Sequence, residues 1–167
     1  GQLSWLSQKI AAIPHIKTLR IHTRLPVVLP QRIDPALLEI LQQWPGKKVV
    51  VIHSNHANEL DDSVKDAIDK LKAVGVTVLN QTVLLKGFND SANTLVELSE
   101  RLFEIGVLPY YLHLLDTVSG AAHFAITDTQ AKAIMGEVTA RLPGYLVPRL
   151  VREEADKTSK TPILPTL

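Results

Sequence analysis

The chain has 167 residues, of which 46% are hydrophobic and 21% charged, and its formal net charge is +1. This length fits one domain with a sizeable core, and the balanced charge argues against a nucleic-acid-binding surface. The sequence contains no cysteine, so it offers neither a disulfide nor a thiolate ligand for zinc or iron. No apolar run is long enough to span a bilayer and the first residues lack the order of a signal peptide, so we expect a cytoplasmic protein without membrane contact.

Strand-like and helix-like segments alternate along the chain. The candidate strands are short apolar runs at residues 18–22, 49–52, 76–79 with a resumption at 83–85, 107–114 and 145–151. The candidate helices repeat apolar residues every three or four positions and lie at 3–13, 34–43, 61–74, 89–105 and 127–142. Residues 27–29 lie between two prolines and are predicted to be extended or loop. Alternating strands and helices predict a parallel sheet with right-handed crossovers.

Two architectures fit four or five such units: an open doubly wound sheet, or part of a barrel, because a closed barrel needs eight. The glycine pattern of dinucleotide-binding folds, G-x-G-x-x-G after a strand, is absent from the sequence. The helix at 3–13 has no strand before it, so we expect a chain that begins inside a fold. We expect a domain over residues 1–152 and a polar, proline-interrupted tail over residues 153–167.

Polar side chains follow four consecutive candidate strands at the point where each strand ends. They are His22, Thr23 and Arg24 after the first, His53, Asn55 and His56 after the second, Asn80 and Gln81 after the third, and His113 and Asp116 after the fourth. In parallel α/β folds the carboxyl ends of the strands share one face, and this face carries the site. A single histidine at a strand end is more often structural than catalytic, but four such ends in succession predict a shared site.

An alternative is a metal-dependent hydrolase built on His22, His53, His56, His113 and Asp116. Within this set, the run His53-x-x-His56-x-x-Glu59 is a candidate metal site. Two imidazoles and a carboxylate suit zinc. Metal-binding histidines on a helix usually lie four residues apart, however, whereas here the spacing is three and follows a strand. We therefore favour a structural role, in which His56 and Glu59 order the turn and Asn58 or Asp61 caps the next helix.

Lys160 lies in the polar tail, within Thr158-Ser159-Lys160-Thr161-Pro162. A lysine that bonds covalently to a carbonyl cofactor needs a lowered pKa, which comes from burial or from neighbouring cations. Nothing in the local sequence provides either, so the residues alone predict a solvated lysine.

Five blocks recur in order over nearly the whole chain. They are RIHTRLPVVLPQRI at residues 20–33, HSNHANE at 53–59, NQTVLLKGFND at 80–90, PYYLHLLD at 109–116 followed by Gly120 and His123-Phe124, and SKTP at 159–162. Together they resemble the lysine 2,3-aminomutase family. The histidine at 113 and the SKTP ending are most similar to the branch that makes (R)-β-lysine for elongation factor P.

The resemblance implies an α/β fold with parallel strands from a partial (βα)6 TIM-like radical SAM barrel whose N-terminal strands are missing. It implies an isomerase that converts L-α-lysine to (R)-β-lysine with S-adenosylmethionine, a [4Fe–4S] cluster and pyridoxal phosphate. The family's C-x-x-x-C-x-x-C cluster motif is expected upstream and is absent from this sequence. We therefore expect that the isolated chain does not perform the reaction.

The resemblance also implies roles for individual residues. Lys160 matches the lysine that holds pyridoxal phosphate, and Asp116 matches an aspartate that binds the distal ammonium of the substrate lysine. Glu153 or Glu154 is the candidate for a second acidic contact. The remaining candidates are cofactor contacts, namely Tyr111 and His113 near the pyridoxal ring and His53, Asn55, His56 and Gln81 near S-adenosylmethionine.

A third interpretation is non-enzymatic, in which a barrel remnant serves only as an assembly module. An incomplete barrel leaves an exposed strand edge near residues 18–22, which invites pairing with another copy. We therefore expect a homo-oligomer, or a disordered N-terminal helix over that edge.

Overall fold

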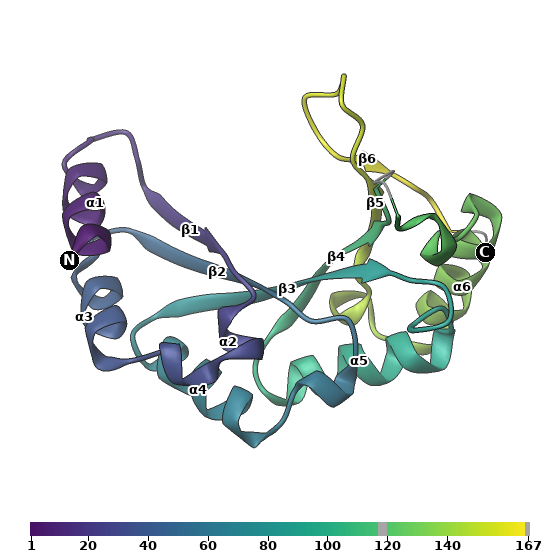
Figure 1. The fold of residues 1–167 in the computed structure, drawn as a ribbon, viewed down its shortest axis with the longest axis horizontal. Helices are drawn as coiled ribbons and strands as arrows, with labels where there is room; N and C mark the ends of the chain where they lie inside the picture. Colours follow the sequence, from purple (N-terminus) through teal and green to yellow (C-terminus); the bar gives the residue numbers. More distant parts are fainter. Residues whose placement is uncertain (117–119, 166–167) are drawn as a thin grey trace.

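The computed structural model describes residues 1–116 and 120–165, which form one curved sheet with helices along its outer side (Figure 1). The strands lie side by side in chain order: β1 (Thr18–His22), β2 (Lys47–His53), β3 (Val76–Leu84), β4 (Leu108–Leu114), β5 (Arg149–Arg152) and β6 (Thr161–Pro162). Strands β1 to β5 pair in parallel, and β6 pairs antiparallel with β5. This arrangement confirms the predicted α/β fold with parallel strands of a partial barrel.

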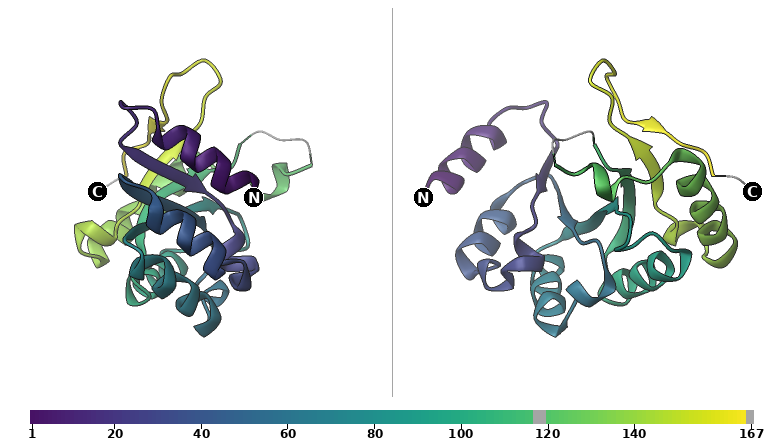
Figure 2. Two further views of the ribbon diagram at one scale, coloured as in Figure 1. Left: turned by 90° about the vertical axis from the view of Figure 1, so that its left-hand side faces the viewer. Right: turned by 45° about the vertical axis from the view of Figure 1, so that its right-hand side comes forward.

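The helices are α1 (Gln2–Ala11), α2 (Leu25–Val28), α3 (Pro35–Gln43), α4 (Asp62–Ala73), α5 (Ala92–Glu104) and α6 (Asp128–Arg141). Short 3-10 turns lie at Pro30–Arg32, Ala57–Glu59, Ala122–Phe124 and Gly144–Leu146. The right-hand view of Figure 2 shows α3 to α6 following one another around the same side of the sheet. A doubly wound sheet would carry helices on both faces and would reverse its strand order, so that alternative is wrong.

Local sequence signals set most helix boundaries. The side chain of Asp34 accepts a hydrogen bond from the Leu37 N–H (2.9 Å), which starts α3. Asp61 caps α4 in the same way by accepting from the Val64 N–H at 3.0 Å. Of the two residues proposed as this cap, Asp61 therefore has the role.

The hydrophobic core fills the space between the helices and the outer face of the sheet. Alternate residues of β2, including Val50 and Ile52, point to this side and are almost completely buried. They pack against the apolar face of α4, for example Ile68 and Leu71. Each such side chain contributes roughly 1.5–3 kcal/mol through burial. The opposite, inner face of the sheet carries polar residues together with apolar ones such as Val51 and Val83.

Three segment predictions were wrong in detail. Residues 25–28 form α2 instead of an extended segment, because a proline such as Pro26 is tolerated in the first turn of a helix and Val27 is buried there. The predicted strand at 145–151 shortens to β5, since residues 144–146 form a 3-10 turn. The two predicted pieces at 76–85 are one strand, β3, with a register shift at Asn80 and Gln81.

The sequence also led to predictions about the edge of the sheet and the two ends of the chain. Strand β1 is the edge strand, and α1, at residues 2–11, packs against α3. The homo-oligomer, the disorder of this helix and the division at residue 152 all stay predictions. Within residues 1–116 and 120–165, no helix has both the length and the apolar character needed to cross a membrane.

Candidate active site

The inner face of the sheet carries polar side chains from neighbouring strands. Successive residues of a strand point to opposite faces, so Gln81 faces inward while Asn80 and Thr82 face the helices. The register places His53 of β2 beside Gln81 of β3, and Gln81 beside Tyr111 of β4. Residues far apart in the sequence therefore form one row across three strands.

A cleft of about 340 Å³ opens at the carboxyl ends of these strands. Its polar lining consists of Arg24, His53, Asn55, Gln81, His113, Asp116 and Glu153. Six of these seven residues were predicted site residues, and the structure brings them together. Arg24 belongs to the strand-end set from which the shared site was predicted, although no individual role was assigned to it.

The C-terminal tail returns to the strand ends and brings Lys160 with it. Strand β6 pairs with β5 so that Thr161 lies beside Arg152 and Pro162 beside Val151. Lys160, directly before β6, forms an ion pair with the carboxylate of Glu153. Its Nζ lies 5.5 Å from the centre of the Tyr111 ring, within range of a cation–π contact. The Lys160 side chain is only 27% exposed, so the prediction of a solvated lysine was wrong. The pairing of β6 with β5, which local sequence does not show, positions this side chain.

His113 lies between Gln81 and Glu153. Its Nε2 is 2.7 Å from Gln81 Nε2, and its Nδ1 is 4.0 Å from a carboxylate oxygen of Glu153. Burial lowers the pKa of His113, and the positive charge of Lys160 lowers it further, although Glu153 and Asp116 act in the opposite direction. The imidazole is therefore neutral at neutral pH. The Lys160 ammonium in turn holds the pKa of Glu153 below its usual range.

His53 is a second neutral imidazole in the cleft. Burial lowers its pKa, and the nearby His22 and Arg24 lower it further. The rings of His22 and His53 meet edge to face at 6.4 Å. Over residues 1–116 and 120–165, His53 Nε2 and Gln81 Oε1 are buried atoms without a hydrogen-bond partner. Such orphaned polar atoms in a cleft fit the polar groups of a bound molecule.

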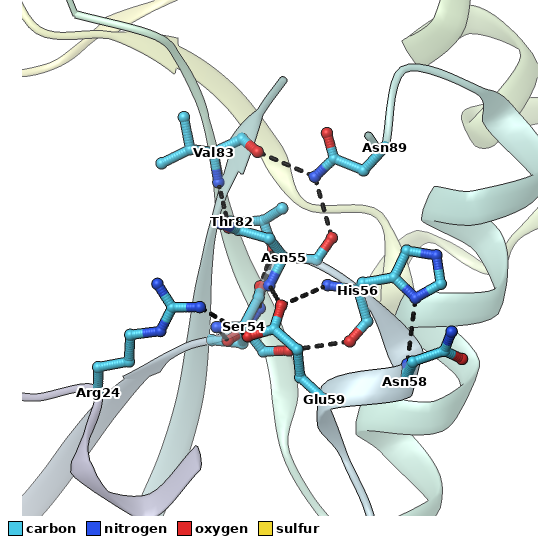
Figure 3. A network of polar contacts seen from close by, with 10 residues as sticks. Arg24, Ser54, Asn55, His56, Asn58, Glu59, Thr82, Val83 and Asn89 are labelled. Carbon is cyan, nitrogen blue, oxygen red and sulfur yellow. Dashed lines mark hydrogen bonds and ion pairs between the residues drawn. The ribbon is translucent and has the colours of Figure 1, made fainter. Parts of the chain in front are cut away.

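Glu59 organises the turn after β2, as Figure 3 shows. One of its carboxylate oxygens accepts hydrogen bonds from the backbone N–H groups of Asn55 (2.7 Å) and His56 (3.0 Å). The other oxygen accepts from the Arg24 guanidinium at 2.8 Å. Glu59 thus fixes the turn and holds Arg24 at the edge of the cleft. His56 Nδ1 accepts a hydrogen bond from the Asn58 N–H at 3.1 Å. His56 and Glu59 therefore have the structural role in the turn that was predicted for them.

The fully buried Asn89 ties Asn55 to strand β3. Its Nδ2 donates to the carbonyl oxygens of Asn55 (3.0 Å) and Val83 (2.9 Å), and its Oδ1 accepts from the Leu85 N–H at 2.7 Å. The Asn55 side-chain oxygen accepts from the Val83 N–H at 2.9 Å. Asn55 is therefore held rigidly where it lines the cleft.

Some predicted residues do not line the cleft. Tyr111 and Lys160 contact each other beside it and are not part of its lining. The His56 side chain packs against Phe88, with ring centres 5.7 Å apart, and does not line the cleft. Asn80 points toward the helices, where it accepts from the Ser54 N–H at 2.8 Å. The hydrolase alternative required three or four side chains around one metal position, and the described part of the chain contains no group of three or more His, Asp or Glu so arranged.

Comparison with known proteins identifies relatives over almost the entire chain. No protein-family model matches it. It is 52% identical over 162 residues to L-lysine 2,3-aminomutase of Escherichia coli, covering 97% of this chain and 47% of that protein. The identity to L-lysine 2,3-aminomutase of Haemophilus influenzae is 51%, covering 96% of this chain and 47% of that protein. The chain thus spans about half the length of the curated relatives it matches.

A solved structure has the same fold. A radical SAM methyltransferase from Sphaerobacter thermophilus superposes with a TM-score of 0.56 at 17% identity, covering 81% of this chain and 40% of that one. At this identity the likeness concerns the fold, which is a curled half-barrel of mostly parallel strands. Over nearly all of its length, the chain is therefore a homologue of the proteins named L-lysine 2,3-aminomutase, and it has the half-barrel fold of a radical SAM enzyme.

Proposed function

We propose that this chain forms the part of an L-lysine 2,3-aminomutase that holds pyridoxal phosphate and the distal end of the substrate. The complete enzyme would convert L-α-lysine to (R)-β-lysine. The observation that carries the proposal is the return of Lys160 to the strand ends, where it pairs with Glu153, a residue of the cleft lining, and lies beside Tyr111. The relatives support it through their names and their identity to the chain.

The residues around Lys160 fit pyridoxal phosphate. A primary amine at the edge of a cleft can bond to its aldehyde, the Tyr111 ring offers a flat apolar surface, and the neutral His113 offers a hydrogen-bonding edge. When bound, the cofactor supplies an electron sink for chemistry at the carbon atoms near the amino group. The chain's contribution is to hold this cofactor through Lys160 and to orient its ring.

Two carboxylates in the same cleft fit the ammonium at the far end of lysine. Asp116 and Glu153 both line the cleft, and Glu153 already binds an ammonium, that of Lys160. Charge-assisted hydrogen bonds from an ammonium to carboxylates are strong and directional. Glu154 is directed elsewhere, since its carboxylate accepts from the Thr161 hydroxyl, so Glu153 is the better candidate for the second contact.

The other two cofactors fit this chain unequally. His53, Asn55 and Gln81 would contact S-adenosylmethionine, which supplies the organic radical, and the unpartnered Nε2 of His53 suits its polar groups. Without any cysteine the chain offers no thiolate ligand for a [4Fe–4S] cluster. We propose accordingly that the isolated chain does not turn over lysine, and that the product of the complete enzyme serves elongation factor P.

Covalent labelling tests the proposal. The protein is mixed with less than one equivalent of pyridoxal phosphate, reduced with borohydride and digested, and the labelled peptide is identified by mass spectrometry. We expect the label on Lys160, because the cleft holds the cofactor against that amine. Lys160→Ala should remove most of the label.

Lys157 provides the matched control. It lies on the same tail and is exposed, so Lys157→Ala should leave the labelling at Lys160 unchanged. Equal labelling of Lys157 and Lys160, or labelling that persists in Lys160→Ala, would contradict a dedicated site.

A further inference from the structure

Four side chains form a continuous polar chain across the cleft. Gln81 contacts His113 at 2.7 Å, His113 faces a carboxylate oxygen of Glu153 at 4.0 Å, and the same oxygen binds the ammonium of Lys160. Gln81 and His113 come from neighbouring strands, whereas Glu153 and Lys160 come from the tail segments on either side of the loop between β5 and β6. Glu153 is thus shared between two groups that can each be cationic.

The proposed function requires a group that accepts a proton from Lys160. An ammonium cannot attack an aldehyde, so Lys160 must lose a proton before it can hold pyridoxal phosphate. Glu153 contacts that ammonium and remains a carboxylate, and the next basic group along the chain of contacts is His113. We propose that His113 takes up the proton released by Lys160, through Glu153, and that the Gln81 amide serves either charge state of the imidazole. This inference rests on the proposed function for Lys160.

The atoms balance without another reactant. One Nζ–H bond of Lys160 breaks and leaves its electron pair on the nitrogen. The proton passes through the Glu153 carboxylate to His113 Nδ1, where a new N–H bond forms. Before the transfer Lys160 is a cation and His113 is neutral; afterwards Lys160 is neutral and His113 is a cation, with Glu153 ionised in both. A rotation of the half-exposed Glu153 side chain closes the 4.0 Å gap.

Gln81 is suited to support both states. The neutral imidazole that can receive a proton at Nδ1 carries its own proton on Nε2, and it needs an acceptor there. Gln81 Oε1 is buried and, among the described residues, has no hydrogen-bond partner. A half-turn of the amide, which replaces the contact of 2.7 Å between Gln81 Nε2 and His113 Nε2, presents this oxygen to His113 Nε2. The imidazolium formed by the transfer then donates from Nδ1 to Glu153 and from Nε2 to Gln81.

The charged groups that face His113 are few. They are Lys160 and Glu153 from the tail, Asp116 from the end of β4, and His53 from β2. Lys160 and His53 disfavour the imidazolium, whereas the two carboxylates favour it. Removing the charge of Lys160 therefore leaves His113 facing Glu153 without a competing cation, which is the condition that favours proton uptake.

Titration of the histidine ring signals by NMR over about pH 5 to 8 tests the inference without any cofactor. His113→Gln identifies the His113 signal. Lys160→Met should raise the pKa of His113, because the competing cation is gone, and Glu153→Gln should lower it. Gln81→Met, which removes the acceptor for the imidazolium, should also lower it. Lys157→Met, on the same tail, should leave the titration unchanged.

An unchanged His113 titration in Lys160→Met, in a protein whose other ring signals remain in place, would overturn the inference. If Lys160→Met fails to fold, Lys160→Gln provides the same loss of charge in a polar side chain. Success or failure of pyridoxal phosphate labelling is a separate result, so a failure of the proposed function is distinguishable from a failure of the proton coupling. The pH profile of the labelling rate adds a second readout: His113→Gln should shift it toward higher pH.

Discussion

The ammonium of Lys160 lies 5.5 Å from the centre of the Tyr111 ring, although Lys160 belongs to the tail and Tyr111 to strand β4. The contact depends on the pairing of β6 with β5, which bends the tail back along the edge of the sheet. Glu153, at the other end of the same loop, holds the ammonium from the second side. The tail is therefore part of the candidate site, and substitutions in the sheet should change the position of the tail.

Glu59 should be important for the shape of the cleft. Glu59→Ala removes an acceptor for two backbone N–H groups and for Arg24, so we expect a loss of roughly 1–2 kcal/mol in the free energy of unfolding. Urea denaturation measures the change. Glu100→Ala, at an exposed position of α5, should change it by less than about 0.5 kcal/mol, and equal effects of the two substitutions would contradict the role of Glu59.

Asn89 should matter more for stability than its size suggests. Asn89→Ala leaves two carbonyl oxygens and one N–H without their partners in a fully buried position, which should cost roughly 2–3 kcal/mol. Asn93→Ala is the matched control, because Asn93 is exposed and its side chain accepts a hydrogen bond from the exposed Arg141. The comparison uses thermal or urea unfolding, and a smaller effect at Asn89 than at Asn93 would count against the network in Figure 3.

Gly46 should tolerate no side chain. A Cβ atom there would lie 2.2 Å from the carbonyl oxygen of Lys17, the same oxygen that accepts from the Lys47 N–H where β1 and β2 begin to pair. Gly46→Ala should therefore destabilise the protein by roughly 1–3 kcal/mol through overpacking. Gly144→Ala places its Cβ in open space and should be nearly neutral, so similar unfolding midpoints for the two variants would show that the close approach is absent.

Stability should fall as the pH drops below about 6.5. Folding lowers the pKa values of His53 and His113 below the ordinary value of 6.5, so the unfolded chain binds more protons than the folded one in this range. The contribution is fully present above pH 6.5 and is lost below it, whereas the Glu153 contribution is lost only below the ordinary carboxyl value of 4.5. Urea midpoints at about pH 5.5 and about pH 7.5 measure the slope. His53→Gln with His113→Gln should flatten it, and a midpoint that is constant in the unsubstituted protein would refute the assignment.

Strand and helix signals in the sequence predicted the arrangement of the site well. Continuous apolar runs and N-caps such as Asp34 identify the βα units, and parallel pairing then places His53, Gln81 and His113 at one end of the sheet. This step needs only the direction of the strands. The strand direction does not determine which of the neighbouring side chains faces the cleft. His56 was therefore predicted as a site residue, although it packs against Phe88.

The tail could not be predicted from local sequence. Strand β6 contains only Thr161 and Pro162, and its pairing depends on the position of β5, so no periodic pattern reveals it. Lys160 was singled out through the resemblance alone. The position of Arg24 just after a strand placed it in the predicted strand-end set, whereas its pairing with Glu59, 35 positions away, has no local signal.

The most direct test of the proposed site is an NMR measurement, on the free protein, of the contact between Lys160 and Tyr111. We predict a nuclear Overhauser effect between the ε-methylene protons of Lys160 and the Tyr111 ring protons, with an upfield ring-current shift that disappears in Tyr111→Leu. A Lys160 signal that shows no such effect and matches the exposed Lys157 would contradict the central claim that the tail lysine joins the strand-end cleft.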